Sequence, residues 1–295
     1  TFKIISREEF YQHSLTTSNH SFLQSIEMTD LLQKRGATIH YIGWDEQGTL
    51  AISAILYSLP MTGGLHYEIN SGPIVTDTRY LPDLKAVQAY VKENGGIEFI
   101  LKPYDHYQVF DSNGNPTEEE QKQLLQSLLD LGYQFDGLQV GYPGGEPVWH
   151  YLKDLTDFDA KSLLKSFNKN CSRNITTALN YDISIRNIKR EEIPQFKQII
   201  EETGKRQGFE DKSLDYYYDL YDNFGDKAEF LIAEINTADA LAYLDQKISL
   251  LNPSSKQYEQ QLQKLEKQKT IVRETLADET VETVPLACAL IIYNP

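Results

Sequence analysis

The hydrophobic positions of residues 238–283 repeat at helical spacing and predict a helical arm. Leu241, Leu244, Ile248 and Leu251 form one series with 3-4-3 spacing. A second series, spaced 4-3-4-3-4, consists of Tyr258, Leu262, Leu265, Lys269, Val272 and Leu276. Each stripe is too narrow for burial in a large core but wide enough for two helices to pack together. We therefore expect an antiparallel coiled-coil hairpin.

The residues between the two series predict where the arm turns. Pro253 cannot continue the first helix. Ser254 and Gln257 have the spacing of a capping box, which predicts the start of the second helix.

The first half of the chain alternates predicted helices and strands. A capping box of Ser6 and Glu9 predicts a short helix through Phe10. Further helices are predicted over 24–35, 80–94 and 117–131, the last capped by Thr117 and Glu120. Strands are predicted over 38–44, 50–59, 65–70 and 97–101. The segments 133–140 and 147–152 close this half around a glycine-containing loop at 141–145.

The second half repeats this order of elements. Residues 188–193 echo residues 5–10, each opening a helix after a short apolar segment, and a second helix is predicted over 213–224. Strands over 228–235 and 285–293 correspond to 38–44 and 50–59. The arm then occupies the place of the four-residue turn 45–48. Such an insertion can be accommodated, since loop tips tolerate added residues while the strands on either side stay paired.

The repeat predicts two mixed α+β domains of similar fold. The expected boundaries are 1–152 for the first domain, 153–237 for the start of the second, 238–283 for the arm and 284–295 for the resumed second domain. The first half continues for some ninety residues beyond its strand pair, whereas the second stops. We therefore expect the sequence to be incomplete at its C-terminal end.

Charge and cysteine usage narrow the function classes. The chain has 28 basic and 43 acidic residues, a net charge of −15, so any polyanion site must be a local basic patch. Cys171 and Cys288 are far apart and lack metal-ligand spacing, which disfavours metal and disulfide frameworks and fits a reducing cytoplasm. No apolar run approaches the roughly 20 residues that span a bilayer.

Catalytic motifs are absent from the sequence. The six histidines occur in no HExxH or GxSxG context, which gives no support to metalloprotease or hydrolase activity. The chain also lacks a GxGxxG motif, a P-loop and an RxxGxG phosphate loop. Ordinary transfer of an acetyl group from acetyl-CoA is therefore disfavoured, and no catalytic residue is identified.

The arm carries a local excess of positive charge. Between residues 256 and 273 five basic residues stand against two acidic ones, a local net charge of +3. The basic residues are Lys256, Lys264, Lys267, Lys269 and Arg273. They are suited to a nucleic-acid backbone, and a second cluster lies at Lys165, Lys169 and Arg173. The alternative is an ordinary solvated coiled-coil face.

Several stretches resemble the FemABX family of peptidoglycan-branching enzymes, closest to its MurN-like streptococcal members. They are 22–25 (FLQS), 70–75 (NSGPIV), 102–105 (KPYD), 164–170 (LKSFNKN) and 211–217 (DKSLDYY). The resemblance covers essentially the whole chain, including the arm. It implies two acetyltransferase-like (GNAT-like) domains in tandem, with an antiparallel coiled-coil arm inserted in the second.

The resemblance also implies an activity. Family members transfer an amino acid such as Ala, Ser or Gly from aminoacyl-tRNA to the stem-peptide lysine or growing cross-bridge of a lipid-linked or nucleotide-linked peptidoglycan precursor. No cofactor is implied, since aminoacyl-tRNA is the co-substrate. We expect charged tRNA and the precursor as partners, and a cytoplasmic protein at the inner face of the membrane.

Cations are expected to bind the diphosphate of the precursor. In the family the position of Lys212 is basic and contacts phosphates, and Arg206 and Tyr216 lie near it in sequence. Lys34 and Arg35 are a second pair, although Leu32 stands where relatives often have lysine. The alternative is that Arg206 and Lys212 pair with acidic neighbours on a solvated face. Those neighbours are Glu201, Glu210 and Asp215.

A substrate groove is expected to involve Asn70, Ser71, Gly72, Pro73, Lys102, Tyr104 and Trp149. Lys102-Pro103 replaces an Asp-Pro dipeptide of many relatives, and Lys102 cannot serve as a carboxylate base. The general base is therefore elsewhere or not needed. The alternatives are a surface lysine at a strand end for Lys102, turn residues for Gly72-Pro73 and an ordinary core residue for Trp149.

Two further functions compete with the aminoacyltransferase. One is a non-catalytic coiled-coil interaction protein on a transferase-like scaffold. The other is acyl transfer from a different thioester or ester donor.

Overall fold

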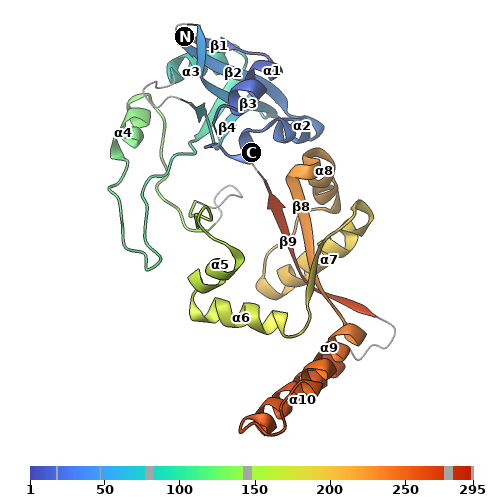
Figure 1. Ribbon diagram of the computed structural model, residues 1–295. Helices are drawn as coiled ribbons and strands as arrows, with labels where there is room; N and C mark the ends of the chain where they lie inside the picture. Colours follow the sequence, from blue (N-terminus) through green and yellow to red (C-terminus); the bar gives the residue numbers. More distant parts are fainter. Residues whose placement is uncertain (18, 47, 77–82, 142–147, 276–281, 294–295) are drawn as a thin grey trace. The chain divides into compact units, whose positions relative to one another are not determined.

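The computed structural model describes the chain except for residues 18, 47, 77–82, 142–147, 276–281 and 294–295 (Figure 1). The chain divides into two compact units. Unit 1 comprises residues 1–149, 222–227 and 292–295, and unit 2 comprises residues 150–221 and 228–291. The predicted loop at 141–145 lies largely outside the described residues.

Unit 1 is built on a mixed sheet with the strand order β1-β2-β3-β4-β6, and β5 pairs with β3. The strands are β1 (Phe2–Ile4), β2 (Thr38–Glu46), β3 (Thr49–Met61), β4 (Gly64–Asn70), β5 (Ile74–Val75) and β6 (Gly96–Lys102). Neighbouring strands are antiparallel except β4 and β6, which are parallel. The four strands that the sequence predicts in this half are confirmed, with ends within a few residues of the expected ones.

Only some of the capping boxes predicted for unit 1 start a helix in the structure. They are α1 (Arg7–Ser14), α2 (Ile26–Lys34), α3 (Leu84–Glu93) and α4 (Lys122–Asp130), with a short 3-10 turn, η1 (Phe22–Gln24), before α2. The capping box of α1 is confirmed, because the Glu9 amide donates to Ser6 Oγ (3.1 Å) and the Ser6 amide donates to Glu9 Oε2 (2.7 Å). For α3, the first residues of the predicted range lie outside the described part.

The predicted start of α4 is wrong. Both the amide and the hydroxyl of Thr117 donate to the carbonyl oxygen of Val109, at 2.9 and 3.2 Å. The amide of Gln121 donates to the carbonyl oxygen of Tyr107 (2.8 Å). Thr117 therefore belongs to a paired loop, and its hydroxyl does not cap a helix. Residues 133–140 form neither helix nor strand.

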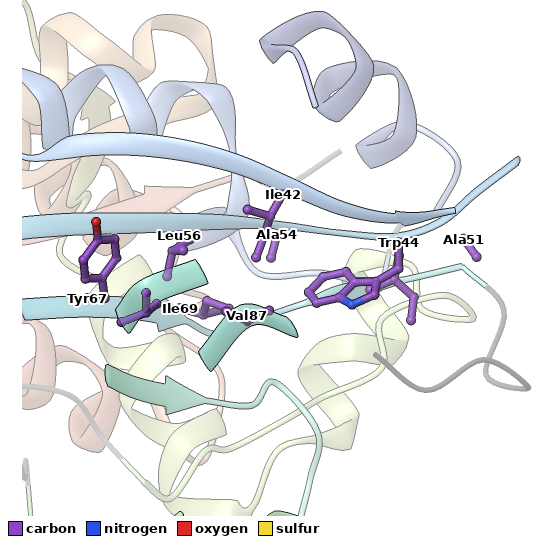
Figure 2. Packing of buried hydrophobic residues seen from close by; sticks show 10 residues of the cluster. Ile42, Trp44, Ala51, Ala54, Leu56, Tyr67, Ile69 and Val87 are labelled. Carbon is purple, nitrogen blue, oxygen red and sulfur yellow. The ribbon is translucent and has the colours of Figure 1, made fainter. Parts of the chain in front are cut away.

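The sheet of unit 1 separates two apolar cores. Figure 2 shows the first, where residues of β2, β3 and β4 pack against Val87 of α3. The second contains Phe10 of α1 and Ile55 of β3. Along β4, Tyr67 and Ile69 enter the first core, so the alternation of side chains turns the residues between and beside them to the other face. Those residues are His66, Glu68 and Asn70.

Unit 2 contains a smaller sheet with the order β7-β8-β9. Its strands are β7 (Ser184–Asn187), β8 (Ala228–Asn236) and β9 (Thr283–Ile292), and its helices include α5 (Ala160–Ser166), α6 (Lys169–Leu179), α7 (Ile193–Gln207) and α8 (Leu214–Phe224). Phe196 of α7 packs against Phe230 of β8 (5.2 Å between ring centroids) and Tyr217 of α8 (5.7 Å). The order β7-α7-α8-β8-β9 parallels β1-α1-α2-β2-β3.

Helices α9 (Thr237–Ser249) and α10 (Tyr258–Thr275) run side by side in opposite directions between β8 and β9 (Figure 1). Ala240, Leu244 and Val272 are buried together with Ile235 of β8. Tyr181, Ile183 and Val284 pack against the same cluster. The base of the arm is thus part of the core of unit 2, whereas the sequence pattern predicted helices that pack only against each other.

The turn of the arm also differs from its prediction. Ser255, and not Ser254, accepts the amide hydrogen bond at the start of α10, from Gln257 to Ser255 Oγ (3.2 Å). The amide of Ser254 itself donates to Asn252 Oδ1 (3.0 Å). No helix within the described residues is long and apolar enough to cross a membrane.

Candidate functional site

The loop that carries Lys212 begins where α7 ends. Gly208 has φ +79°, a left-handed conformation that favours glycine. The amides of Gly208 and Phe209 both donate to the carbonyl oxygen of Gly204, at 2.7 and 3.1 Å. This close reversal stops the helix. Residues 209–213 then lead directly into α8.

The side chain of Asp211 anchors this loop to unit 2. It is only 6% exposed. Asp211 Oδ1 accepts hydrogen bonds from the Tyr217 hydroxyl (2.5 Å) and from the Lys212 amide (2.7 Å). Asp211 Oδ2 lies 3.3 Å from Lys197 Nζ of α7. One buried carboxylate therefore ties the loop to both flanking helices.

Lys212 points out of the loop that Asp211 anchors. Its side chain is exposed, and its ammonium lies 6.0 Å from the ring centroid of Tyr216. Within the described part of the chain, neither Lys212 nor Arg206 forms an ion pair, so the alternative of pairing with acidic neighbours is not seen. Glu201 is instead paired with Lys197. Arg206 is exposed in the last turn of α7, where a cation complements the helix dipole.

Lys34 and Arg35 lie in unit 1, at the C-terminal end of α2. Both side chains are exposed. Leu32, where relatives often have lysine, lines a small pocket of about 40 Å³. The pocket is lined by Leu23, Gln24, Met28, Leu32, Ile55, Tyr57 and Asn70. Its wall is mostly apolar, so α2 presents no cation there.

The loop after β4 is held by a buried glutamine. Gln24 is 1% exposed, and its Nε2 donates to the carbonyl oxygen of Asn70 (2.7 Å). Its Oε1 accepts the amide of Ile55 (2.8 Å). A Cβ at Gly72 would lie 2.8 Å from Gln24 Cδ, so the backbone of Gly72 approaches the pinned amide closely. Ser71 adopts φ +50° at the turn.

A row of charged groups runs along β4 and β6 beside this loop. Lys102 Nζ lies 2.8 Å from Glu68 Oε1, and the Glu68 side chain is 8% exposed. His66 bridges two carboxylates, with Nε2 3.3 Å from Glu68 Oε2 and Nδ1 2.6 Å from Glu98 Oε2. Lys102 pairs with Asn70 in the strand register. Lys102 does lie at a strand end with its side chain one third exposed, as the surface-lysine alternative expects, but its ammonium partners a buried acid.

Tyr104 and Trp149 are the exposed aromatic residues of the predicted groove. Tyr104 is 48% exposed and Trp149 is 53% exposed. The ring of Trp149 lies 5.5 Å from that of Phe110. Trp149 is therefore not an ordinary core tryptophan.

The basic residues of the arm do not share one environment. Lys256, Lys264, Lys267 and Arg273 are exposed. Lys269 is different, since its side chain is 11% exposed and its ammonium lies 2.5 Å from Asp245 Oδ1 of α9. The expectation that Lys269 contacts tRNA is therefore wrong, because its ammonium is paired with Asp245 within the seam of the arm.

Three residues that hold the predicted groups in place were not singled out from the sequence. They are Gln24, Glu68 and Asp211. Glu68 had a readable signal, since polar residues alternate with apolar ones along 65–70. Gln24 has partners 31 and 46 residues away, so no local pattern identified it. Asp211 has nearby partners, but its burial is not marked by any local pattern.

Comparisons with known proteins identify the family. The model of the FemAB family matches residues 5–295. Aminoacyltransferase FemB of Staphylococcus epidermidis is 28% identical over 247 residues, which cover 82% of this chain and 59% of the relative. Aminoacyltransferase FemA of Staphylococcus aureus is 23% identical over 261 residues, which cover 85% of this chain and 61% of the relative. The chain thus spans about three fifths of these relatives.

A solved structure supports the same conclusion at the level of the fold. The crystal structure of FemX matches 100% of this chain and 77% of that chain, with a TM-score of 0.70 and 18% identity. The mixed α+β architecture of this chain is therefore that of FemX. Together with the match over residues 5–295, this shows that the chain belongs to the FemAB family.

Proposed function

We propose that the protein transfers an amino acid, Ala, Ser or Gly, from aminoacyl-tRNA to the stem-peptide lysine or growing cross-bridge of a lipid-linked peptidoglycan precursor. The observation that carries the proposal is the family match over residues 5–295. The relatives FemB and FemA are named aminoacyltransferases, which supports an acyl transfer reaction. In this proposal units 1 and 2 are tandem acetyltransferase-like domains, and the arm is an antiparallel coiled coil.

The reaction requires binding and orientation more than a nucleophilic side chain. The amine nitrogen of the acceptor forms a bond to the aminoacyl carbon, and the ester bond to the tRNA ribose breaks. The amine loses a proton and the ribose oxygen gains one. A lysine at position 102, paired with Glu68, is not a carboxylate base, so we assign no general base to the protein.

Lys212 is the residue that we propose for the diphosphate of the precursor. Its ammonium is exposed on an anchored loop and forms no ion pair within the described residues. A lysine in this state can offer its full charge to a phosphate. Arg206 and Tyr216 are the neighbouring candidates. In unit 1 we propose that the Asn70–Pro73 loop, Lys102 and Tyr104 line the acceptor groove.

The exposed cations of residues 256–273 suit the phosphate backbone of tRNA. Lys256, Lys264, Lys267 and Arg273 lie on a chain with a net charge of −15, so the arm is a local exception. Contacts of this kind weaken as salt rises. A lipid-linked precursor would place the protein in the cytoplasm at the inner face of the membrane.

A mass assay tests the proposed reaction. Full-length protein is incubated with alanyl-, seryl- or glycyl-tRNA and a lysine-containing precursor, and we expect a mass increase of one amino acid with one donor. Lys212→Ala should slow the reaction at limiting precursor, whereas exposed Lys161→Ala is the matched control. No increase with any donor would contradict the transferase and favour a non-catalytic interaction protein.

A further inference from the structure

The carboxylate of Asp211 faces inward from the same loop that presents Lys212 to solvent. We propose that Asp211 is a positioning residue, which fixes the Lys212 backbone so that the ammonium meets a diphosphate group. This inference rests on the proposed function. It assigns a role to a buried acid outside the set of residues that contact substrate.

Asp211 has an unusually complete set of partners for a loop residue. The Lys212 amide donates to Oδ1 at 2.7 Å, and the Tyr217 hydroxyl donates to the same oxygen at 2.5 Å. Lys197 Nζ reaches Oδ2 at 3.3 Å. The contact to the Lys212 amide is the direct link, because it fixes the peptide group from which the Lys212 side chain starts.

The hydroxyl of Tyr217 stays a donor throughout the physiological range. Burial, followed by the hydrogen bond to Asp211, raises the pKa of Tyr217 well above its ordinary value. Tyr217 is itself fixed, because its ring packs edge-on against Phe196 of the core. The anchor therefore connects the loop to a rigid part of unit 2.

The charge of Asp211 is balanced from the interior side. Lys197 lies between Asp211 and Glu201, and its side chain is 16% exposed. The neighbouring thiol of Cys288 remains neutral, since burial, followed by the charge of Asp211, raises its pKa to about 11. Within the described residues, Lys212 forms no ion pair with these groups. Its positive charge thus remains available for an anionic ligand.

Pre-organisation is the physical gain from this arrangement. A lysine side chain loses rotamer freedom when it binds a phosphate, and a mobile backbone would add a further loss. With the amide of Lys212 fixed by its neighbour, only the side chain has to be ordered. A nucleotide or lipid diphosphate can then be bound without first ordering residues 209–213.

A double-mutant cycle separates positioning from general stabilisation of the fold. The probe is a soluble UDP-linked muramyl pentapeptide, which contains the diphosphate, and the readout is Kd for full-length wild type, D211A, K212A and D211A/K212A. Alanine removes the acceptor oxygen that asparagine would keep. We expect K212A to weaken binding about tenfold and D211A about three- to tenfold. We expect the double variant to match K212A, because Asp211 acts through Lys212.

Y217F tests the same anchor if D211A fails to fold. It removes one donor and keeps the ring, and its effect on Kd should also vanish in the K212A background. Thermal unfolding of each variant checks that binding is measured on folded protein.

Three results would overturn the proposal. A D211A effect of equal size in both backgrounds would show that Asp211 does not act through Lys212. Unchanged affinity in D211A would show that the anchor is dispensable for binding. Unchanged affinity in K212A would remove the phosphate site on which the proposal rests, while the mass assay reports separately on the transfer reaction.

Discussion

Lys102 and Glu68 form an ion pair across the parallel strands β6 and β4, with 2.8 Å between Lys102 Nζ and Glu68 Oε1. The carboxylate is buried, whereas the lysine side chain is one third exposed. The pair therefore places a positive charge at the edge of the proposed acceptor groove and neutralises a buried negative charge.

Removing the positive partner alone should destabilise unit 1. We expect Lys102→Met to lower the free energy of unfolding by about 1 to 2 kcal/mol, less than for a fully buried pair because Lys102 is partly solvated. The double variant Glu68→Gln/Lys102→Met removes both charges and should recover most of that loss. Urea unfolding of the three proteins measures both effects. Equal stability of wild type and Lys102→Met would contradict the pairing.

The buried amide of Gln24 makes a second stability prediction. Gln24→Leu removes the partners of the Ile55 amide and the Asn70 carbonyl, so we expect a loss of about 2 kcal/mol or more. Gly72→Ala should also destabilise, because its Cβ would meet an amide that two hydrogen bonds prevent from moving. Thermal or urea unfolding measures both variants.

The two substitutions should not be additive. In a Gln24→Ala background the neighbour of Gly72 is gone, so Gly72→Ala should cost much less than in wild type. Full additivity would show that the Gly72 backbone is not restricted by Gln24.

The arm lysines should divide into two classes. Lys264→Ala/Lys267→Ala should weaken tRNA binding and reduce the slope of log K against log salt by about one for each phosphate that the protein no longer neutralises. Lys269→Ala is the matched comparison, since its charge is paired with Asp245. It should lower the melting temperature and leave the salt slope nearly unchanged. A reduced salt slope in Lys269→Ala together with an unchanged slope in Lys264→Ala/Lys267→Ala would contradict this assignment and place the tRNA on the seam side of the arm.

Shortening the arm should be tolerated only beyond its base. Replacing residues 249–264 by a short glycine linker keeps Ala240, Leu244 and Val272 in the core of unit 2, so cooperative unfolding should persist. Deleting 238–283 removes all three residues and should abolish it. Circular dichroism during thermal unfolding distinguishes the variants. A folded full deletion would show that the arm is independent of the core.

Buried histidines predict a loss of stability in mild acid. Burial lowers the pKa of His13, His20 and His40 below the ordinary value of 6.5. As the pH falls from 7.5 through 6.5, these histidines bind protons in the unfolded chain but not in the folded chain. The free energy of unfolding should therefore fall over this range.

A single histidine can be tested within this trend. His13 Nδ1 lies 2.8 Å from Ser53 Oγ, and His13→Gln should reduce the pH dependence of unfolding by up to one proton. Exposed His106→Gln is the matched control. An unchanged pH dependence in His13→Gln would contradict the role of this residue.

Local sequence signals predicted those elements whose determinants are themselves local. The Ser6/Glu9 box starts α1, and apolar periodicity located β2, β3 and β8. The Thr117/Glu120 box failed because the loop at 107–109 takes the hydrogen-bonding groups of Thr117. A capping pattern predicts only what happens when no distant backbone competes for the same atoms.

The sequence predicted the exposed charged residues of the candidate site. It did not predict the buried residues that hold them in place. Lys212 and the loop at 70–73 were identified through resemblance to the family. Asp211 and Gln24 lie in stretches that resemble the family but were given no role, since a buried polar residue is understood only through partners that the fold supplies, such as Ile55 and Asn70 for Gln24. The same reasoning explains Lys269, whose spacing placed it in the apolar seam but whose partner there, Asp245 of α9, was not identified from the sequence.

The pair of Lys269 and Asp245 also sets the axial register of the arm. A slip of one helical turn would move the ammonium from Asp245 to apolar side chains of α9 such as Leu241, without its carboxylate. The alignment of α9 and α10 is therefore specified by one charge in the seam. The position of the outer lysines along the arm, which the proposed function assigns to contact with tRNA, therefore depends on an ion pair inside the seam.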